Sequence, residues 1–147
     1  MTRYERTQTG CAMIWILFAA ALLVATGQFF HTPPAREISV IVSILLLITI
    51  AGFYKLTIMI DTEVLRWSFG IGVISKKVPI AEIAACEPIR IRWWYGWGIH
   101  LTPYGWLYNV AGWNAVAITL RNGRKFALGT DDPQGLTEAI RRLASAR

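Results

Sequence analysis

Two long apolar stretches open the chain, and segments in which apolar and polar residues alternate follow them. Residues 11–30 contain no charged side chain over twenty positions, enough helix to cross a hydrocarbon core about 30 Å thick. A second apolar run covers residues 38–60 and is interrupted only by Lys55. Its lipid part is expected at residues 38–54, with Tyr54 and Lys55 as the interfacial anchor. The pattern therefore predicts two transmembrane helices.

The segment between these runs, HTPPARE at residues 31–37, is polar and contains two prolines, which is typical of a tight external loop. The two helices are then expected to form an antiparallel hairpin. A cleaved signal peptide over residues 1–27 is the alternative, but the apolar run continues through Phe29 and Phe30. Lys and Arg near the membrane ends favour residues 1–10 and the C-terminal part as the cytoplasmic sides. We therefore expect a multi-pass protein of the inner (plasma) membrane with both termini in the cytoplasm.

After Tyr54 the apolar residues alternate with polar ones, which is typical of β-strands. KLTIMI and VLRWSFG, separated by DTE, predict a β-hairpin that buries one face. That face carries Leu56, Ile58 and Ile60 opposite Leu65, Trp67 and Phe69. A third strand is expected in VISKKVPI, where Lys76 and Lys77 mark the outer side of an edge, and a fourth over residues 84–92.

The segment AVAITLRNGRKFALG predicts a second hairpin. A two-residue turn at Asn122-Gly123 would place Phe126 on the wrong face. A three-residue loop over residues 121–123, with Gly123 in the left-handed region, instead pairs Ile118 with Phe126 and Val116 with Leu128. We expect the three-residue loop.

The C-terminal segment DDPQGLTEAIRRLASAR predicts an amphipathic helix. Asp132 is a good N-cap and Pro133 suits the first helical position. The apolar residues that follow have helical spacing and should face the sheet: Leu136, Ala139, Ile140, Leu143 and Ala144.

Short strands in GIHLT and WLYNV bring the expected total to about seven antiparallel strands before this helix. The segments WWYGWGIHLTP, GWLYNVAG and AVAITLRNGRKFALGTDDP, with the helix after them, resemble those of small bacterial membrane proteins that carry a pleckstrin-homology-like domain behind two spans. The resemblance implies a split β-barrel over residues 55–147, capped by the helix. That group is largely uncharacterised, so the resemblance implies no catalytic residues.

Composition supports a membrane location and gives little chemistry. The chain is 54% hydrophobic, and its charge of +6 comes from 15 Lys and Arg against 9 Asp and Glu without a polybasic run. The two cysteines, Cys11 and Cys86, are far apart and form no metal-binding motif, so both are expected to be packing residues.

Residues 93–113 hold eight aromatic residues and four glycines, which fits a buried core, a stacking platform for bases or sugars, or a belt at a membrane surface. Alternation should send about half of the rings into the core. The others should lie in a membrane-facing loop, where guanidinium groups meet phosphates and indoles lie at headgroup depth. The residues expected on this membrane or ligand surface are Lys76, Lys77, Arg90, Arg92, Trp93, Trp94, Tyr95 and Trp97.

Enzymatic chemistry is not expected. His100 is the one histidine after the apolar runs, and no nucleophile with a base, phosphate loop or metal spacing is evident. We expect a non-catalytic binding or scaffold module at the inner leaflet, with no cofactor and no nucleic-acid partner. Its expected partners are the lipid bilayer, anionic headgroups or another membrane protein. The alternative is a protein-interaction or self-assembly subunit of a membrane complex.

Overall fold

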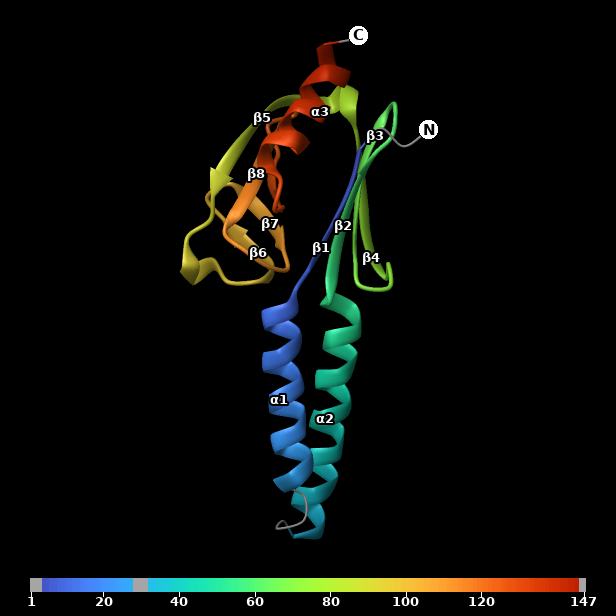
Figure 1. Cartoon of the computed structure of the whole chain (residues 1–147), viewed down its shortest axis with the longest axis vertical. Coiled ribbons are helices and arrows are strands. Elements are labelled where there is room, and N and C mark those ends of the chain that lie inside the picture. The colour runs from blue at the N-terminus through green and yellow to red at the C-terminus, as the bar shows by residue number, and fades with distance from the viewer. Residues whose placement is uncertain (1–3, 28–31, 146–147) are drawn as a thin grey trace.

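The computed structural model describes residues 4–27 and 32–145, without the side chain of Pro34. Two helices lie side by side and extend from one end of a β domain, and a third helix lies at the domain's other end (Figure 1). The helices are α1 (Cys11–Gly27), α2 (Pro33–Phe53) and α3 (Pro133–Ser145). The strands are β1 (Tyr4–Thr9), β2 (Lys55–Ile60), β3 (Val64–Phe69), β4 (Ile74–Pro79), β5 (Ile83–Arg90), β6 (Gly98–Thr102), β7 (Gly105–Asn109), β8 (Asn114–Leu120) and β9 (Lys125–Gly129).

The strands form two sheets, so the expected single barrel of about seven antiparallel strands is wrong. The first sheet has four strands in the order β1-β2-β3-β4, and the second has five in the order β5-β8-β9-β7-β6. Within the second sheet β7 pairs with β9 in parallel, from Trp106 opposite Phe126 to Tyr108 opposite Leu128. This pairing joins strands that are not neighbours in sequence, and an alternation pattern carries no information about it.

The N-terminal segment, expected to be a cytoplasmic tail over residues 1–10, contains strand β1. It pairs with β2 along its whole length, from Tyr4 opposite Ile60 to Thr9 opposite Lys55. Glu5, Arg6 and Thr7 are exposed, so β1 lacks the apolar alternation that identifies a strand in the sequence. The segment is a strand because the edge of β2 offers backbone hydrogen bonds, and this adds the fourth strand to the first sheet.

The helical part also corrects the expected pair of membrane-spanning helices. Among the described residues one helix is long and apolar enough to cross a membrane, Ala35–Phe53 in α2. The 17 described residues of α1 measure about 26 Å at 1.5 Å per residue, short of the roughly 30 Å core. Residues 28–30, expected to end the first span, lie outside the described residues. The expected loop at 31–37 is wrong from Pro33 onward, because prolines at the first helical positions start α2 there.

The two helices expose most of their large apolar side chains. Trp15 is 69% exposed, Leu23 74% and Ile38 63%, whereas the described helical residues that are buried are the small Ala21 and Ser39. Exposing this much apolar surface to water is unfavourable. The helical pair is therefore suited to an apolar solvent.

The core of the β domain lies between the two sheets and confirms the predicted hairpin of β2 and β3. Leu56 pairs with Phe69, Ile58 with Trp67 and Ile60 with Leu65, and all six side chains are buried. The second sheet contributes Tyr108, Val116, Ile118, Phe126 and Leu128 to the same cluster.

Helix α3 packs on this core through Leu136, Ile140 and Leu143, as its spacing predicts. Ala144 is exposed, so its predicted burial is wrong, and Thr137 is buried instead. Asp132 caps the helix as expected, with its Oδ1 accepting a hydrogen bond from the Gly135 N–H at 3.0 Å.

The loop between β8 and β9 confirms the predicted three-residue connection. Val116 pairs with Leu128 and Ile118 with Phe126, and the Leu120 N–H donates to the Arg124 carbonyl at 2.9 Å. Gly123 has φ +83° and occupies the left-handed region. This connection directs Phe126 and Leu128 of β9 towards the core.

Strand β1 is fastened to the start of α3 by two side-chain contacts. The Arg6 guanidinium donates from Nε and Nη2 to the two carboxylate oxygens of Asp131 at 2.9 and 2.8 Å, and Arg6 lowers the pKa of Asp131. The Tyr4 hydroxyl donates to Asp132 at 3.3 Å. Burial, followed by the negative charge of Asp132, raises the pKa of Tyr4 to about 12.

This contact predicts an alkaline sensitivity. Because the pKa of Tyr4 is about 12 when folded and 10 when unfolded, the stability it contributes is complete below pH 10 and is lost as pH rises towards 12. At pH 8 the free energy of unfolding of Tyr4→Phe should be about 1 kcal/mol lower than that of the parent, because Phe cannot make the hydrogen bond to Asp132. The gap between variant and parent should then close between pH 10 and 12 in denaturant titrations. A gap that is constant over this range would contradict the assignment.

Candidate functional site

The connection between β5 and β6, residues 91–97, carries most of the residues expected at the membrane surface, and we call it the aromatic loop. Its middle is a single 3₁₀ turn over Trp93–Tyr95, after which Gly96 at φ +65° lets the chain reverse. Trp93 is 73% exposed and Trp94 55%. Large apolar rings held outward on a tight turn are suited to contact another surface.

The basic and aromatic side chains of this loop contact one another. The rings of Trp93 and Trp94 meet edge to face at 5.9 Å, and the Arg92 guanidinium lies 4.9 Å from the centroid of the Trp94 ring. Arg90 lines the same surface hollow as these three residues. The structure thus brings together four of the expected residues.

The remaining rings of the loop point inward and hold it in place. Trp97 stacks on Trp113 with 6.1 Å between ring centroids and 29° between planes. Tyr95 is half-buried against a small core cluster that includes Leu107 and Ala127. Of the eight rings in residues 93–113, Tyr108 is buried and Tyr95 and Trp97 are half-buried, so fewer than half lie in the core. Tyr95 and Trp97, which were expected on the membrane surface, instead support the loop.

The aromatic loop lies at the end of the β domain from which the helices extend (Figure 1). The Ile91 N–H donates to the Trp113 carbonyl at 2.6 Å, which fixes the loop to the turn between β7 and β8. That turn contacts the start of α1, because Gln8 donates to the Ala111 carbonyl at 2.9 Å and Gly10 lies against Val110. The outward indoles are therefore held near the level at which α1 begins.

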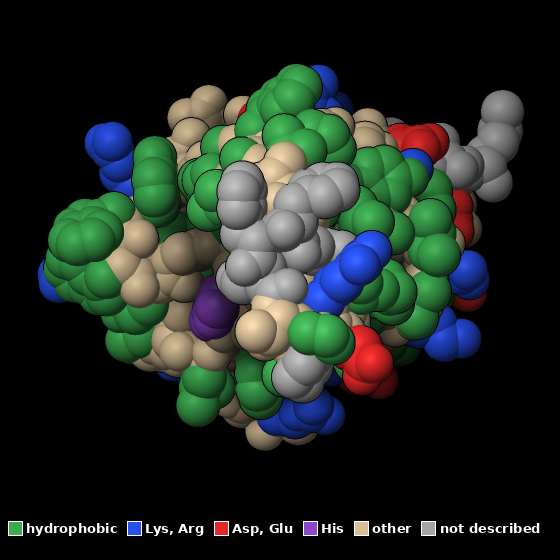
Figure 2. Space-filling model, turned by 90° about the horizontal axis from the view of Figure 1, so that it is seen from below, with side chains coloured by type: hydrophobic (Ala, Val, Ile, Leu, Met, Phe, Trp, Pro, Cys, Tyr) green, Lys and Arg blue, Asp and Glu red, His purple; other side chains and the backbone are tan. Residues whose placement is uncertain are grey.

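A second exposed apolar group lies at the same end, on the turn between β3 and β4. Gly70 donates its N–H to the Lys55 carbonyl at 2.8 Å and lies so close to the backbone of Gly52 that a side chain would not fit. In this turn Ile71 is 71% exposed and Val73 78%. Seen from below, hydrophobic side chains are spread over much of this face of the molecule (Figure 2). We call Ile71, Val73, Trp93 and Trp94 the apolar rim.

Lys55 and Tyr54 lie where α2 passes into β2, as the sequence predicts for an interfacial anchor. The Lys55 ammonium lies 5.3 Å from the centroid of the Tyr54 ring. Both side chains are half-buried.

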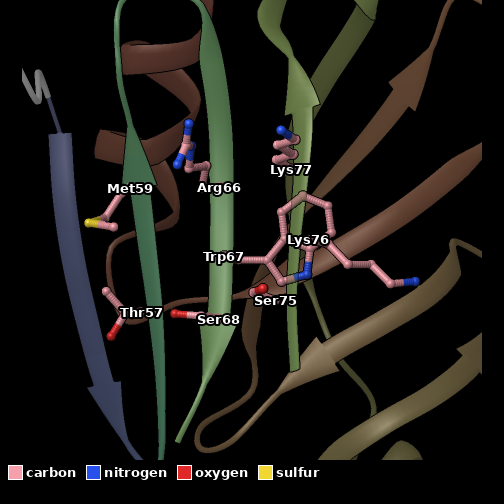
Figure 3. Close-up of a pocket in the computed structure, with 8 residues that line it drawn as sticks. All are labelled: Thr57, Met59, Arg66, Trp67, Ser68, Ser75, Lys76 and Lys77. Carbon is pink, nitrogen blue, oxygen red and sulfur yellow. The ribbon is translucent and has the colours of Figure 1, made fainter. Parts of the chain in front are cut away.

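Lys76 and Lys77 lie on β4, away from the aromatic loop. The Lys76 ammonium donates to the Tyr108 hydroxyl at 2.9 Å and lies 5.3 Å from the centroid of its ring. Both lysines line a hollow of about 430 Å³ on the first sheet, together with Arg66 and the hydroxyl groups of Thr57, Ser68 and Ser75 (Figure 3). The expected set of eight residues is thus divided between two places.

His100 and Cys86, the side chains of the domain with the chemistry of a base or a nucleophile, have structural partners. His100 Nε2, in β6, lies 2.6 Å from the carbonyl of Trp97 at the end of the aromatic loop. The Cys86 thiol is buried against the Thr137 carbonyl at 3.8 Å, and burial raises its pKa. Among the described residues no group of three or more His, Cys, Asp or Glu side chains could hold a metal ion.

Sequence reasoning missed three residues of this region: Ile71, Val73 and Trp113. A signal was present for Ile71, because Gly70 and Gly72 flank it between two expected strands. Val73 was expected to begin the third strand, but that strand starts at Ile74. Trp113 was named only as part of the aromatic stretch, and its pairing with Trp97 depends on tertiary structure.

Comparison with known proteins gives no further constraint: no family model, no curated protein and no solved structure matches this chain. The family resemblance expected from the sequence therefore stays a prediction.

The stack of Trp97 on Trp113 predicts a local effect. Trp113→Ala should remove the ring that supports the aromatic loop, and contacts between aromatic rings contribute about 0.5–1.5 kcal/mol beyond their buried area. Amide hydrogen exchange over residues 93–98 should become about three- to tenfold faster. Trp106→Ala, which removes a half-exposed indole elsewhere, is the matched control and should leave these amides unchanged. Equal effects from the two variants would show that the stack does not hold the loop.

Proposed function

We propose that the protein is a non-catalytic, membrane-anchored module that holds its β domain against the inner face of the plasma membrane. In this arrangement the apolar segment Ala35–Phe53 of α2 crosses the apolar layer. Two observations support the anchor: the length of the apolar segment Ala35–Phe53 and the exposed apolar surface of both helices.

The observation that carries the proposal is the direct continuation of both helices into paired strands. One residue, Gly10, separates β1 from α1, and one, Tyr54, separates α2 from β2. The Gly10 N–H donates to the Tyr54 carbonyl at 2.9 Å, which closes the junction. Without a flexible linker, the orientation of the β domain on a bilayer follows from that of the helices.

This orientation brings the apolar rim to the membrane surface. Indole rings favour the headgroup region, and a basic residue near an anionic surface contributes about 1 kcal/mol. Arg90 and Arg92 lie beside Trp93 and Trp94, so this side combines both kinds of contact. Ile71 and Val73 supply apolar contacts from the turn between β3 and β4.

The distribution of Lys and Arg supports the cytoplasmic side for the β domain. Residues 55–147 carry 12 Lys and Arg against 7 Asp and Glu, whereas residues 28–37, which follow α1 in the sequence, contain Arg36 as their single Lys or Arg. Excess positive charge favours the cytoplasmic side.

The orientation can be tested in living cells. A reporter that is active only in the cytoplasm should be active when fused after Arg147 and inactive when inserted within residues 28–31. Both fusions should be produced in equal amounts, as judged by immunoblotting. The opposite pattern of activity would invert the proposed orientation.

The lipid contact can be tested with the full chain in nanodiscs that contain lipids brominated near the headgroup. Trp93→Ala/Trp94→Ala should remove a clear share of the quenched tryptophan emission, since these indoles are held at headgroup depth. Trp106→Ala is the control and should remove emission that the bromines do not quench. Trp15, in α1, gives the same background in every sample.

Unchanged quenching in the double variant would place the aromatic loop outside the interface. Anionic lipid should increase the quenching at low salt and lose this effect at high salt, because Arg90 and Arg92 act through a screened potential. Circular dichroism should confirm that each variant is folded.

A further inference from the structure

Strand β4 ends the first sheet, and one of its edges has no partner strand. It pairs with β3 from Ile74 opposite Phe69 to Pro79 opposite Val64, and no other described strand pairs with it. An edge of this kind presents a row of N–H and C=O groups to whatever lies beside it.

This open edge forms one wall of a cleft of about 680 Å³, which we call the β4 cleft. Five consecutive residues, Ser75 to Pro79, line it, so the cleft follows the edge of the strand rather than one of its faces. The opposite wall comes from the second sheet and includes Leu101 and Trp106, which are 70% and 50% exposed. A chain lying in the cleft would have backbone partners on one side and apolar side chains on the other.

The cleft is strongly basic. Lys76, Lys77, Arg124 and Lys125 line it, against one acidic residue, Glu82. The ion pairs between described residues, Arg6 with Asp131 and Arg142 with Glu138, include none of these five. Lys76 extends from β4 on the side away from β3 (Figure 3). The cleft therefore favours a negatively charged occupant.

A buried donor without a partner belongs to a residue that lines the cleft. Trp67 is 3% exposed and lines the cleft, and its ring stacks on Phe126 at 4.9 Å. Its indole Nε1 is buried and makes no hydrogen bond within the described part of the chain. A buried donor left unpaired is unfavourable, and an acceptor that reached it would remove this cost.

We propose that the β4 cleft binds an acidic segment of a partner protein in extended conformation, which adds to β4 as a further strand of the first sheet. Strand addition uses the open backbone edge, and the acidic side chains on one face of the segment meet the cations that lie on that face of the cleft. Apolar side chains alternate with them and contact Leu101 and Trp106. The inference deepens the proposed function and rests on it, since it states what a membrane-anchored module would hold.

The test uses the full chain in nanodiscs of neutral lipid and a capped synthetic peptide, Val-Glu-Val-Glu-Val-Glu. This peptide should bind, and the same peptide with Lys in place of Glu should bind at least tenfold more weakly. Two further peptides carry N-methyl groups on alternate residues. One is methylated at the Val residues and the other at the Glu residues. The peptide whose methyl groups replace the N–H groups facing β4 should bind at least tenfold more weakly. The other peptide should bind as before, because its methylated N–H groups point away from the strand.

Matched variants test the site. Arg124→Glu/Lys125→Glu should weaken binding of the Glu peptide at least tenfold. The control Arg121→Glu/Arg142→Glu makes the same change of charge at exposed residues that do not line the cleft, and it should leave binding unchanged. In the parent protein, the peptide should slow hydrogen exchange of the β4 amides that do not bond to β3. Circular dichroism should show the parent spectrum for both variants.

Several results would overturn the proposal: no binding of the Glu peptide, equal effects of the two methylated peptides, or equal effects of the two double variants. Nanodiscs with anionic lipid that protect the β4 amides without peptide would assign the cleft to lipid and overturn it as well. These measurements use neutral lipid, so their failure leaves the quenching of Trp93 and Trp94 as a separate test of the membrane contact.

Discussion

The pairing of β1 with β2 is the constraint on which the rest of the structure depends. Each strand continues a helix, and the register from Tyr4 opposite Ile60 to Thr9 opposite Lys55 holds the two chains together up to the level of Gly10 and Tyr54. A helical pair joined to a sheet in this way cannot swing independently of it. The same pairing gives β2 two neighbours, which keeps Leu56 and Ile58 in the core at 0% and 2% exposure. Anchor and core thus share one set of backbone hydrogen bonds.

Two surfaces follow from this geometry, and they differ in their distance from the helical pair. The apolar rim lies at the end of the domain where the helices begin. Strand β4 rises from that end, so Lys77 lies about 10 Å beyond Ile74 at about 3.3 Å per residue. The Debye length at physiological salt is about 8 Å. In the proposed orientation Lys77 would lie about one Debye length beyond Ile74, where its attraction to headgroups is weakened, and this favours a partner in solution over lipid at that site.

Local patterns predicted the parts of the fold in which neighbouring segments pack on each other. The alternation of apolar and polar residues from Leu56 to Phe69 predicted the first hairpin correctly. The three-residue loop was predicted because a two-residue turn at Asn122-Gly123 would place Phe126 on the wrong face of the sheet. The sequence failed where long-range pairing decides. Strand β1 is polar on its exposed positions, and the parallel pairing of β7 with β9 leaves no local signature. Among the site residues, Trp93 and Trp94 could be selected by their basic neighbours, but the separation of Lys76 and Lys77 from them depends on which sheet each strand joins.

A continuous series of aromatic rings connects the end of α2 to the cleft. The ring centroid of Phe53, at the end of α2, lies 5.4 Å from that of Phe69, and the centroid of Phe69 lies 6.2 Å from that of Tyr108. Tyr108 in turn contacts Trp67 at 5.4 Å and accepts the hydrogen bond from Lys76. Protein interiors are close-packed, so these rings hold fixed positions relative to one another. The basic wall of the cleft is thus positioned from the last turn of α2 through side chains as well as through backbone. A segment bound beside β4 would be held at a set height and direction relative to the membrane, which is the geometry that a scaffold requires.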